Sequence, residues 1–238
     1  MNEVAYLTSN GEREINEDCI GNKTNGDIQV FVVADGLGGH GLGNIASQGA
    51  CDIVLDNIFE IGLEAAVDLV QETLLEQQRV NGLQEKMKTT ITVVVLNDSK
   101  FTQLHLGDSR IYHFNKRKML FRTLDHSVCQ KLANANLIKE SEIRHHRDRN
   151  RLLEVLGMEW KNGRPYEIKE GILNKKFEAI LMCTDGFWEW IEEKEMIKCL
   201  KKSDSPQEWL NMMEEIILEN GQGNHMDNYS AIAIFYED

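Results

Sequence analysis

Short apolar runs separated by polar turns mark the first third of the chain. This pattern predicts strands over residues 4–8 and 30–34. Two stretches with helical character follow at 45–58 and 62–80, and Asn81-Gly82 then supplies a helix stop signal. The chain therefore begins with strands and continues into a pair of helices.

Strands predominate in the middle of the chain. The turns between them are only a few residues long, as at Asn97-Asp98 and Asn115-Lys116. Such connections cannot hold a helical crossover, so we expect antiparallel pairing. The predicted strands are 90–96, 101–106, 111–114 and 119–122.

The pattern becomes helical and charged after Asp125 until about residue 156, and strands return near 166–170 and 179–183. The last helix has the clearest signals: Ser205 as N-cap, Pro206 at the first helical position, and Glu208 to complete a capping box. Its apolar stripe ends at Gly221, and a strand over 230–235 follows. This element order predicts an α+β protein with two packed, mainly antiparallel sheets covered by helices.

Composition narrows the class of protein. No internal repeat, low-complexity tract or linker divides residues 1–238, which predicts a single domain, and we expect a monomer. No apolar stretch is long enough to cross a membrane, and the N-terminus lacks the pattern of a secretory signal. Five widely spaced cysteines without a C-x-x-C pair indicate a reducing, cytoplasmic compartment. A net charge of −13 opposes binding to nucleic acid.

Four aspartates stand at the edges of predicted strands: Asp18, Asp35, Asp185 and Asp227. A carboxylate that leaves an apolar strand for a cleft loses hydration unless a partner compensates it. Divalent cations that prefer oxygen ligands are suitable partners, and two of them would balance four carboxylates. The alternative for any one position is an ordinary Asp-containing turn.

The glycine-rich segment 36–41 admits a second interpretation. It matches G-x-G-x-x-G between a strand and a helix, and Asp56 follows about twenty residues later, as in a dinucleotide-binding fingerprint. However, Asp56 falls within a predicted helix, and the chain stays helical up to residue 80. The βαβ unit that this fingerprint requires is therefore missing.

Eight short segments, taken in order along nearly the whole chain, resemble the metal-dependent protein phosphatase family of the protein phosphatase 2C type, in its short bacterial form. They are REINED at 13–18, ADGLGGH at 34–40 leading to Ala46-Ser47, TT at 89–90, GDSRIY at 107–112, LDHS at 124–127, RN at 149–150 before Leu156-Gly157, CTDG at 183–186 and DN at 227–228.

The resemblance implies a four-layer α-β-β-α sandwich with a flap at about residues 125–160. It also implies that Asp18, Asp35, Asp185 and Asp227 bind two Mn²⁺ or Mg²⁺ ions, with the Gly36 carbonyl as a further ligand. Asp108 resembles the residue that helps to hold a third, weaker metal ion. Arg13 resembles the arginine that binds the substrate phosphate.

The implied activity is hydrolysis of phosphoserine and phosphothreonine in proteins. Two cations about 3.5–4 Å apart can hold a bridging hydroxide for in-line attack and neutralise charge on the phosphoryl oxygens. Arg13 can offer two parallel donors to a phosphate, which lysine cannot do equally well. The implied partners are phosphorylated proteins, including substrates of a serine/threonine kinase or such a kinase itself.

The leaving alkoxide needs a proton donor. Leu37 stands where eukaryotic members carry a histidine directly after the Asp-Gly pair, so the candidate acid is His40 in the same loop. For His126, next to Asp125, we expect a structural role in a hydrogen-bonded turn, and for Trp188 and Trp190 a packing role.

A cationic segment at 144–151 contains four arginines and two histidines in this acidic chain. It could dock an acidic phosphopeptide, or it could be a solvated helix start balanced by Glu140 and Glu142. The leading hypothesis is an active phosphatase, because all four strand-edge aspartates are present. The alternative is a catalytically silent regulatory or phosphate-binding module on the same fold.

Overall fold

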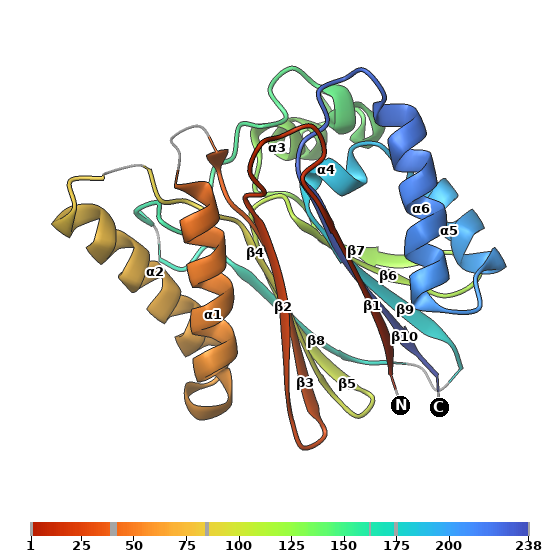
Figure 1. Cartoon of the computed structure of the whole chain (residues 1–238), viewed down its shortest axis with the longest axis horizontal. Coiled ribbons are helices and arrows are strands. Elements are labelled where there is room, and N and C mark those ends of the chain that lie inside the picture. Colours follow the sequence, from red (N-terminus) through yellow and green to blue (C-terminus); the bar gives the residue numbers. More distant parts are fainter. Residues whose placement is uncertain (1, 39–41, 84–85, 162, 174–175, 238) are drawn as a thin grey trace.

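Two five-stranded antiparallel sheets pack face to face in the structure, a computed structural model that describes residues 2–38, 42–83, 86–161, 163–173 and 176–237 (Figure 1). The first sheet has the order β1 (Glu3–Ser9), β10 (Tyr229–Tyr236), β9 (Glu178–Cys183), β6 (Arg110–Phe114), β7 (Met119–Arg122). The second has the order β2 (Asp18–Asn25), β3 (Ile28–Asp35), β4 (Ile91–Asn97), β5 (Lys100–Leu106), β8 (Glu167–Ile172).

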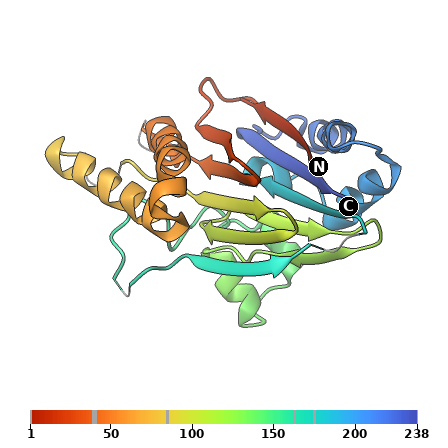
Figure 2. The same cartoon turned by 90° about the horizontal axis from the view of Figure 1, so that it is seen from below.

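Helices cover the outer face of each sheet, which completes four layers (Figures 1 and 2). The helices α1 (Gly43–Ile61) and α2 (Leu63–Val80) lie on the second sheet, and α5 (Glu193–Lys202) and α6 (Pro206–Gly221) lie on the first. Near one end of the sandwich are α3 (Val128–Asn134), the 3₁₀ helix η2 (Glu140–His145) and the single turn α4 (Asp185–Trp188). The predicted α-β-β-α fold is confirmed.

Strand β3 shows why a continuous apolar run forms part of this fold. Val30 and Val32 contribute to the core beneath α1 and α2, whereas Phe31 and Val33 contribute to the core between the sheets. Because alternate side chains of a strand point to opposite faces, a strand buried on both faces is apolar at every position. The run therefore places the end of β3, at Asp35, where the chain leaves the interior.

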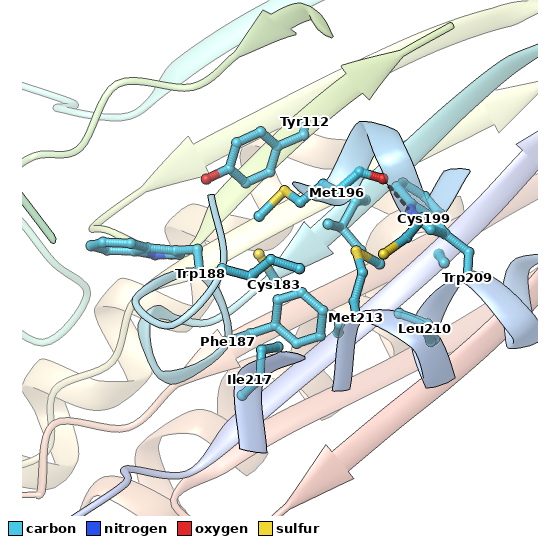
Figure 3. Close-up of a cluster of buried hydrophobic side chains, with 14 of the residues drawn as sticks. Tyr112, Cys183, Phe187, Trp188, Met196, Cys199, Trp209, Leu210, Met213 and Ile217 are labelled. Carbon is cyan, nitrogen blue, oxygen red and sulfur yellow. Dashed lines mark hydrogen bonds between the residues drawn. The ribbon is translucent and has the colours of Figure 1, made fainter. Parts of the chain in front are cut away.

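A third core fills the space between the first sheet and helices α5 and α6 (Figure 3). In α6, Trp209, Met213 and Ile217 are buried, as the predicted stripe requires. Ser205 caps this helix by accepting a hydrogen bond from the Glu208 backbone at 3.2 Å. The predicted capping box is wrong in one detail. The Glu208 carboxylate accepts a hydrogen bond from the backbone of Asp204 and not from the backbone of Ser205.

The structure corrects the expected helical character of residues 125–156. Only α3 and η2 are helical there, and the rest of the segment consists of turns and isolated bridges. One bridge joins Thr89 to Leu156 and another joins Ser127 to Leu152. These bridges direct backbone hydrogen bonds to neighbouring loops, and a helix would have kept those bonds within the segment.

The antiparallel topology excludes the dinucleotide-binding alternative. Strand β3 pairs with β2 and with β4, and both pairings are antiparallel. The helices α1 and α2 connect β3 to β4, so this connection does not build the parallel βαβ unit that the fingerprint needs. No helix within the described residues is both long enough and apolar enough to span a membrane.

Candidate active site

Strand register brings the sequence-predicted aspartates to one end of the sandwich. Asp18 begins β2 and lies directly opposite Asp35, the last residue of β3. In the other sheet, Ala231 near the start of β10 lies opposite Cys183 at the end of β9. Asp185 follows β9 and Asp227 precedes β10, so both residues lie at the same end of this antiparallel strand pair.

Asp108 joins this group from the turn between β5 and β6. Its side chain is buried, with 5% of the residue exposed. His126 forms two hydrogen bonds with Gly107, the residue before Asp108. The His126 backbone donates to the Gly107 carbonyl at 2.8 Å, and the His126 Nδ1 accepts from the Gly107 backbone at 3.1 Å. His126 thus lies in a hydrogen-bonded turn that fixes the backbone beside Asp108.

These carboxyl groups are close enough to alter each other's ionisation. Burial raises the pKa of Asp18 to about 7. Burial also raises the pKa of Asp35, with further contributions from the charges of Asp18, Asp185 and Asp108. Burial likewise raises the pKa of Asp185, and the charge of Arg149 opposes this shift. The site therefore concentrates negative charge that water solvates poorly.

A cleft of about 390 Å³ opens over these groups. Three larger hollows, of about 540, 610 and 420 Å³, lie over β8, at the α1–α2 connection and beside Arg144, but they do not contain the clustered aspartates. The chemistry of the lining therefore identifies the candidate site. The cleft is lined by Arg13, Glu17, Asp35, Gly36, Leu37, Gly38, Asp108, Asn150, Leu152, Asp185, Asp227 and Asn228.

Gly36 brings the backbone of the loop after β3 close to neighbouring segments. A Cβ at this position would lie 2.2 Å from the Gly43 carbonyl oxygen and 2.7 Å from that of Glu17. The Gly36 backbone donates to the Glu17 carbonyl at 3.0 Å. A larger residue would displace this loop, and with it the carbonyl group beside Asp35.

Arg13 lies on the rim of the cleft. Its guanidinium donates to the Asp227 carboxylate at 2.9 Å, and 58% of its side chain is exposed. Gly11, with a φ of +56°, allows this N-terminal loop to approach Asp227, because a Cβ there would lie 2.1 Å from the Asp227 carbonyl oxygen. Arg13 therefore presents donors both to Asp227 and to the cleft.

Comparison with known proteins identifies the family to which this chain belongs. The family model described as Protein phosphatase 2C matches residues 10–221. The chain belongs to the protein phosphatase 2C family. The family and the enzyme class predicted from the sequence, a protein-serine/threonine phosphatase, are therefore confirmed.

Relatives of this phosphatase include the serine/threonine phosphatase stp of Listeria monocytogenes serotype 4b, which is 29% identical over 243 residues, with 96% of this chain and 94% of that one covered. The crystal structure of Stp1 from Staphylococcus aureus has a TM-score of 0.88 at 24% identity and covers 100% and 96% of the two chains. The structure of the PstP catalytic domain in complex with two manganese ions has a TM-score of 0.81 at 22% identity and covers 100% and 99%.

In the phosphatase site, sequence reasoning named Arg149 in a matched segment and in the cationic segment, but it missed Glu189 and the ion pairs that Arg149 forms. Arg149 donates to Asp185 at 3.1 Å and pairs with Glu189 at 2.6 Å. Glu189 is buried, and this burial raises its pKa to about 7. The sequence gives no signal for this ion pair, because its partners are 40 positions apart and no periodicity relates them.

Other missed residues hold the aspartates in place. The Thr184 hydroxyl donates to Asp18 at 2.9 Å. The Asn228 side chain accepts from the Glu17 backbone at 2.9 Å and donates to the carbonyls of Asn10 and Ile15, each at 3.0 Å. Both residues lay in the matched segments CTDG and DN, so a polar residue next to each predicted ligand was the available signal.

The arginines of the cationic segment at 144–151 do not form one continuous surface patch. Arg144 and Arg149 point inward to acidic partners, whereas Arg147 and Arg151 both pair with Asp148 at 3.5 Å. Local acids therefore balance the segment, although through different residues from the predicted Glu140 and Glu142. His40 lies outside the described residues.

Proposed function

We propose that this phosphatase depends on divalent cations and hydrolyses phosphoserine and phosphothreonine in proteins. Asp18, Asp35, Asp185 and Asp227 would hold two Mn²⁺ or Mg²⁺ ions together with the Gly36 carbonyl, and Asp108 would help to hold a third, weaker ion. The observation that carries the proposal is the convergence of carboxyl groups from both sheets: Asp35, Asp108, Asp185 and Asp227 line one cleft, and Asp18 lies opposite Asp35 in the strand pairing.

The donor chemistry of the cleft fits such ions. All the groups concerned offer oxygen atoms, which Mn²⁺ and Mg²⁺ prefer. Burial raises the pKa values of Asp18, Asp35 and Asp185, although the Arg149 charge opposes the shift for Asp185, and bound cations would stabilise the charged carboxylates. Within the described residues, no three acidic, histidine or cysteine side chains are already arranged as a metal-binding cluster, so the fit rests on donor type and charge.

The chain's own residues would share the remaining tasks. Bound cations would activate water and neutralise charge on the phosphate, as in other two-metal sites. Arg13 would bind and orient the phosphate through two parallel donors. Leu37 and Leu152 line the cleft and would limit access of bulk water. His40, as candidate proton donor to the leaving alkoxide, stays a prediction.

A phosphopeptide assay with controlled metal content tests the proposal. Protein stripped of metal should release phosphate from phosphoserine and phosphothreonine peptides only after Mn²⁺ or Mg²⁺ is added, and EDTA should abolish turnover. EDTA saturated with Mn²⁺ beforehand is the control and should not inhibit. Full activity in excess EDTA would contradict the metal dependence. Tight Mn²⁺ binding without turnover would favour the silent regulatory module.

Replacing Arg13 with alanine should chiefly weaken substrate binding. A hydrogen bond to a charged group contributes about 1.5–3 kcal/mol, so KM for a phosphopeptide should rise by about tenfold or more. Arg79→Ala is a matched control, because Arg79 is also exposed and paired with a carboxylate, Glu76, but lies at the end of α2. An unchanged KM for Arg13→Ala would remove the role assigned to it.

A further inference from the structure

The buried indole of Trp188 connects two acidic parts of the site. Trp188 is 1% exposed and ends α4, three residues after Asp185 begins that helical turn. Its Nε1–H donates to the backbone carbonyl of Asp108 at 2.9 Å. A single side chain thus ties α4 of one connection to the β5–β6 turn of another.

The two connected segments carry the carboxyl groups of Asp108 and Asp185, which repel each other. Burial raises the pKa of Asp108, and the charge of Asp185 is the next largest cause. Like charges in a poorly hydrated site push their backbones apart unless other contacts resist. The hydrogen bond from Trp188 to the Asp108 carbonyl is such a contact.

Trp188 is itself held by two buried arginines. The guanidinium of Arg110 lies 3.5 Å from the centre of the indole ring. Arg110 is fixed in turn by two hydrogen bonds to Asp125, at 2.8 and 2.7 Å, and by one to Tyr112 at 3.1 Å. A cation over an aromatic face is attractive, and a desolvated pair is stronger than an exposed one.

Arg144 secures the backbone of the same residue. It donates to the Trp188 carbonyl and also to Glu193 at 2.7 Å, and its guanidinium carbon lies 5.7 Å from the indole centre. Arg144 belongs to η2, in the segment that follows α3. The side chain and the main chain of Trp188 are therefore both fixed, which leaves its N–H aimed at Asp108.

A packing role alone would not distinguish Trp188 from Trp209. Trp209 is also fully buried in the same core, and its Nε1–H also donates to a backbone carbonyl, that of Met196, at 2.9 Å. The two labelled tryptophans lie at opposite ends of the cluster in the view of Figure 3. Trp209 contacts no residue of the candidate site among the interactions described for it.

We propose that Trp188 is a positioning residue for the cation site, in that its indole N–H holds the Asp108 backbone at a fixed place relative to Asp185. This inference rests on the proposed function, because it assumes that Asp108 helps to bind a cation. The sequence predicted only a packing role for Trp188, and positioning Asp108 is a further role.

Substituting phenylalanine for each tryptophan tests the inference. Trp188→Phe keeps an aromatic face for Arg110 and removes the N–H donor, and Trp209→Phe is the matched control. Calorimetric titration of metal-free protein with Mn²⁺ should show a Kd about tenfold higher in Trp188→Phe for the ion whose binding is lost in Asp108→Ala. Trp209→Phe should change that Kd by less than about twofold, while both variants lose thermal stability. Equal changes in Kd, or no change in Trp188→Phe, would overturn the inference.

Combining the substitutions shows whether Trp188 acts through Asp108. In an Asp108→Ala background, Trp188→Phe should leave the Kd of the remaining Mn²⁺ ions unchanged, because the carboxylate that Trp188 positions is gone. A rise of about tenfold in that Kd would contradict this route. If Trp188→Phe does not fold, Arg144→Gln should raise the same Kd by releasing the Trp188 carbonyl, and an unchanged Kd would count against the inference.

Binding and turnover separate this inference from the proposed function. If wild-type protein binds Mn²⁺ but hydrolyses no phosphopeptide, the proposed catalytic function fails while the comparison of Kd values still tests Trp188. If wild-type protein hydrolyses phosphopeptides and Trp188→Phe matches it in Mn²⁺ Kd, only the positioning role fails.

Discussion

Replacing Asp185 with asparagine is expected to lower kcat for a phosphopeptide by about 10³-fold. In the proposed site, Asp185 is one of the four carboxylates that hold the cation pair, and such ions supply several kcal/mol of stabilisation in the transition state. Asparagine has nearly the same shape but lacks the charge. The measurement is kcat at saturating Mn²⁺, with calorimetric titration of Mn²⁺ binding on the same sample.

The fold of this variant should persist, which separates lost chemistry from lost structure. Asp185 repels other carboxylates and raises the pKa of Asp35, so removing its charge relieves a cost in the metal-free protein. We therefore expect the metal-free variant to have a Tm no lower than that of the wild type. Asp204→Asn, at an exposed position before α6, is the control and should leave kcat unchanged. Retention of more than a tenth of wild-type kcat in Asp185→Asn would refute the assigned role.

Replacing Asp125 with alanine is expected to cost about 3–5 kcal/mol of stability, since it leaves a buried charge without its partner. Arg110 and Asp125 form two hydrogen bonds, and each side chain is only 1% exposed. Urea unfolding followed by circular dichroism gives the free energy of unfolding for wild type and variant.

An exposed ion pair provides the comparison for Asp125. Lys23 and Asp56 lie 3.0 Å apart, with side chains 44% and 75% exposed. Asp56→Ala should therefore change the free energy of unfolding by less than about 1 kcal/mol. A loss as small as this in Asp125→Ala would mean that Trp188 and Tyr112 alone compensate the Arg110 charge.

The sequence was most informative where burial forces a simple pattern. The apolar run that ends at Asp35 is buried on both faces, and the short turns from β4 to β5 and from β6 to β7 join antiparallel neighbours. The equally short turn from β5 to β6 instead crosses from one sheet to the other, so the antiparallel pairing expected there is wrong. The positions of the predicted ligands at strand edges follow from the buried run and the antiparallel pairing. The aspartates could therefore be named before the structure was known, although their roles stay proposals.

Elements with weak patterns were predicted less well. The bounds of strand β2 were not predicted, because it is an edge strand of its sheet and its last four residues are exposed and polar. Helix α5 was missed, since only Met196, Cys199 and Leu200 of its ten residues are buried. In both elements, a small buried area produces few apolar positions.

Contacts between distant segments could not be predicted from local patterns. The pairing of Arg149 with Asp185 and the hydrogen bond from Trp188 to Asp108 join residues 36 and 80 positions apart. Their formation depends on how the two sheets and the segment between β7 and β8 pack together. The packing role expected for Trp188 accounts for its burial but not for the hydrogen bond that its indole N–H donates to Asp108.

The antiparallel pairing of β1 with β10 makes the two ends of the chain neighbours (Figure 1). During synthesis, residues 18–172 can assemble all five strands of the second sheet, whereas the first sheet cannot be completed until β10 has left the ribosome. Pairing strands so far apart in the sequence costs loop-closure entropy and slows folding. Asp227, directly before β10, therefore reaches the other four acidic groups last, and a nascent chain would acquire its complete cleft only after β10 has been synthesised.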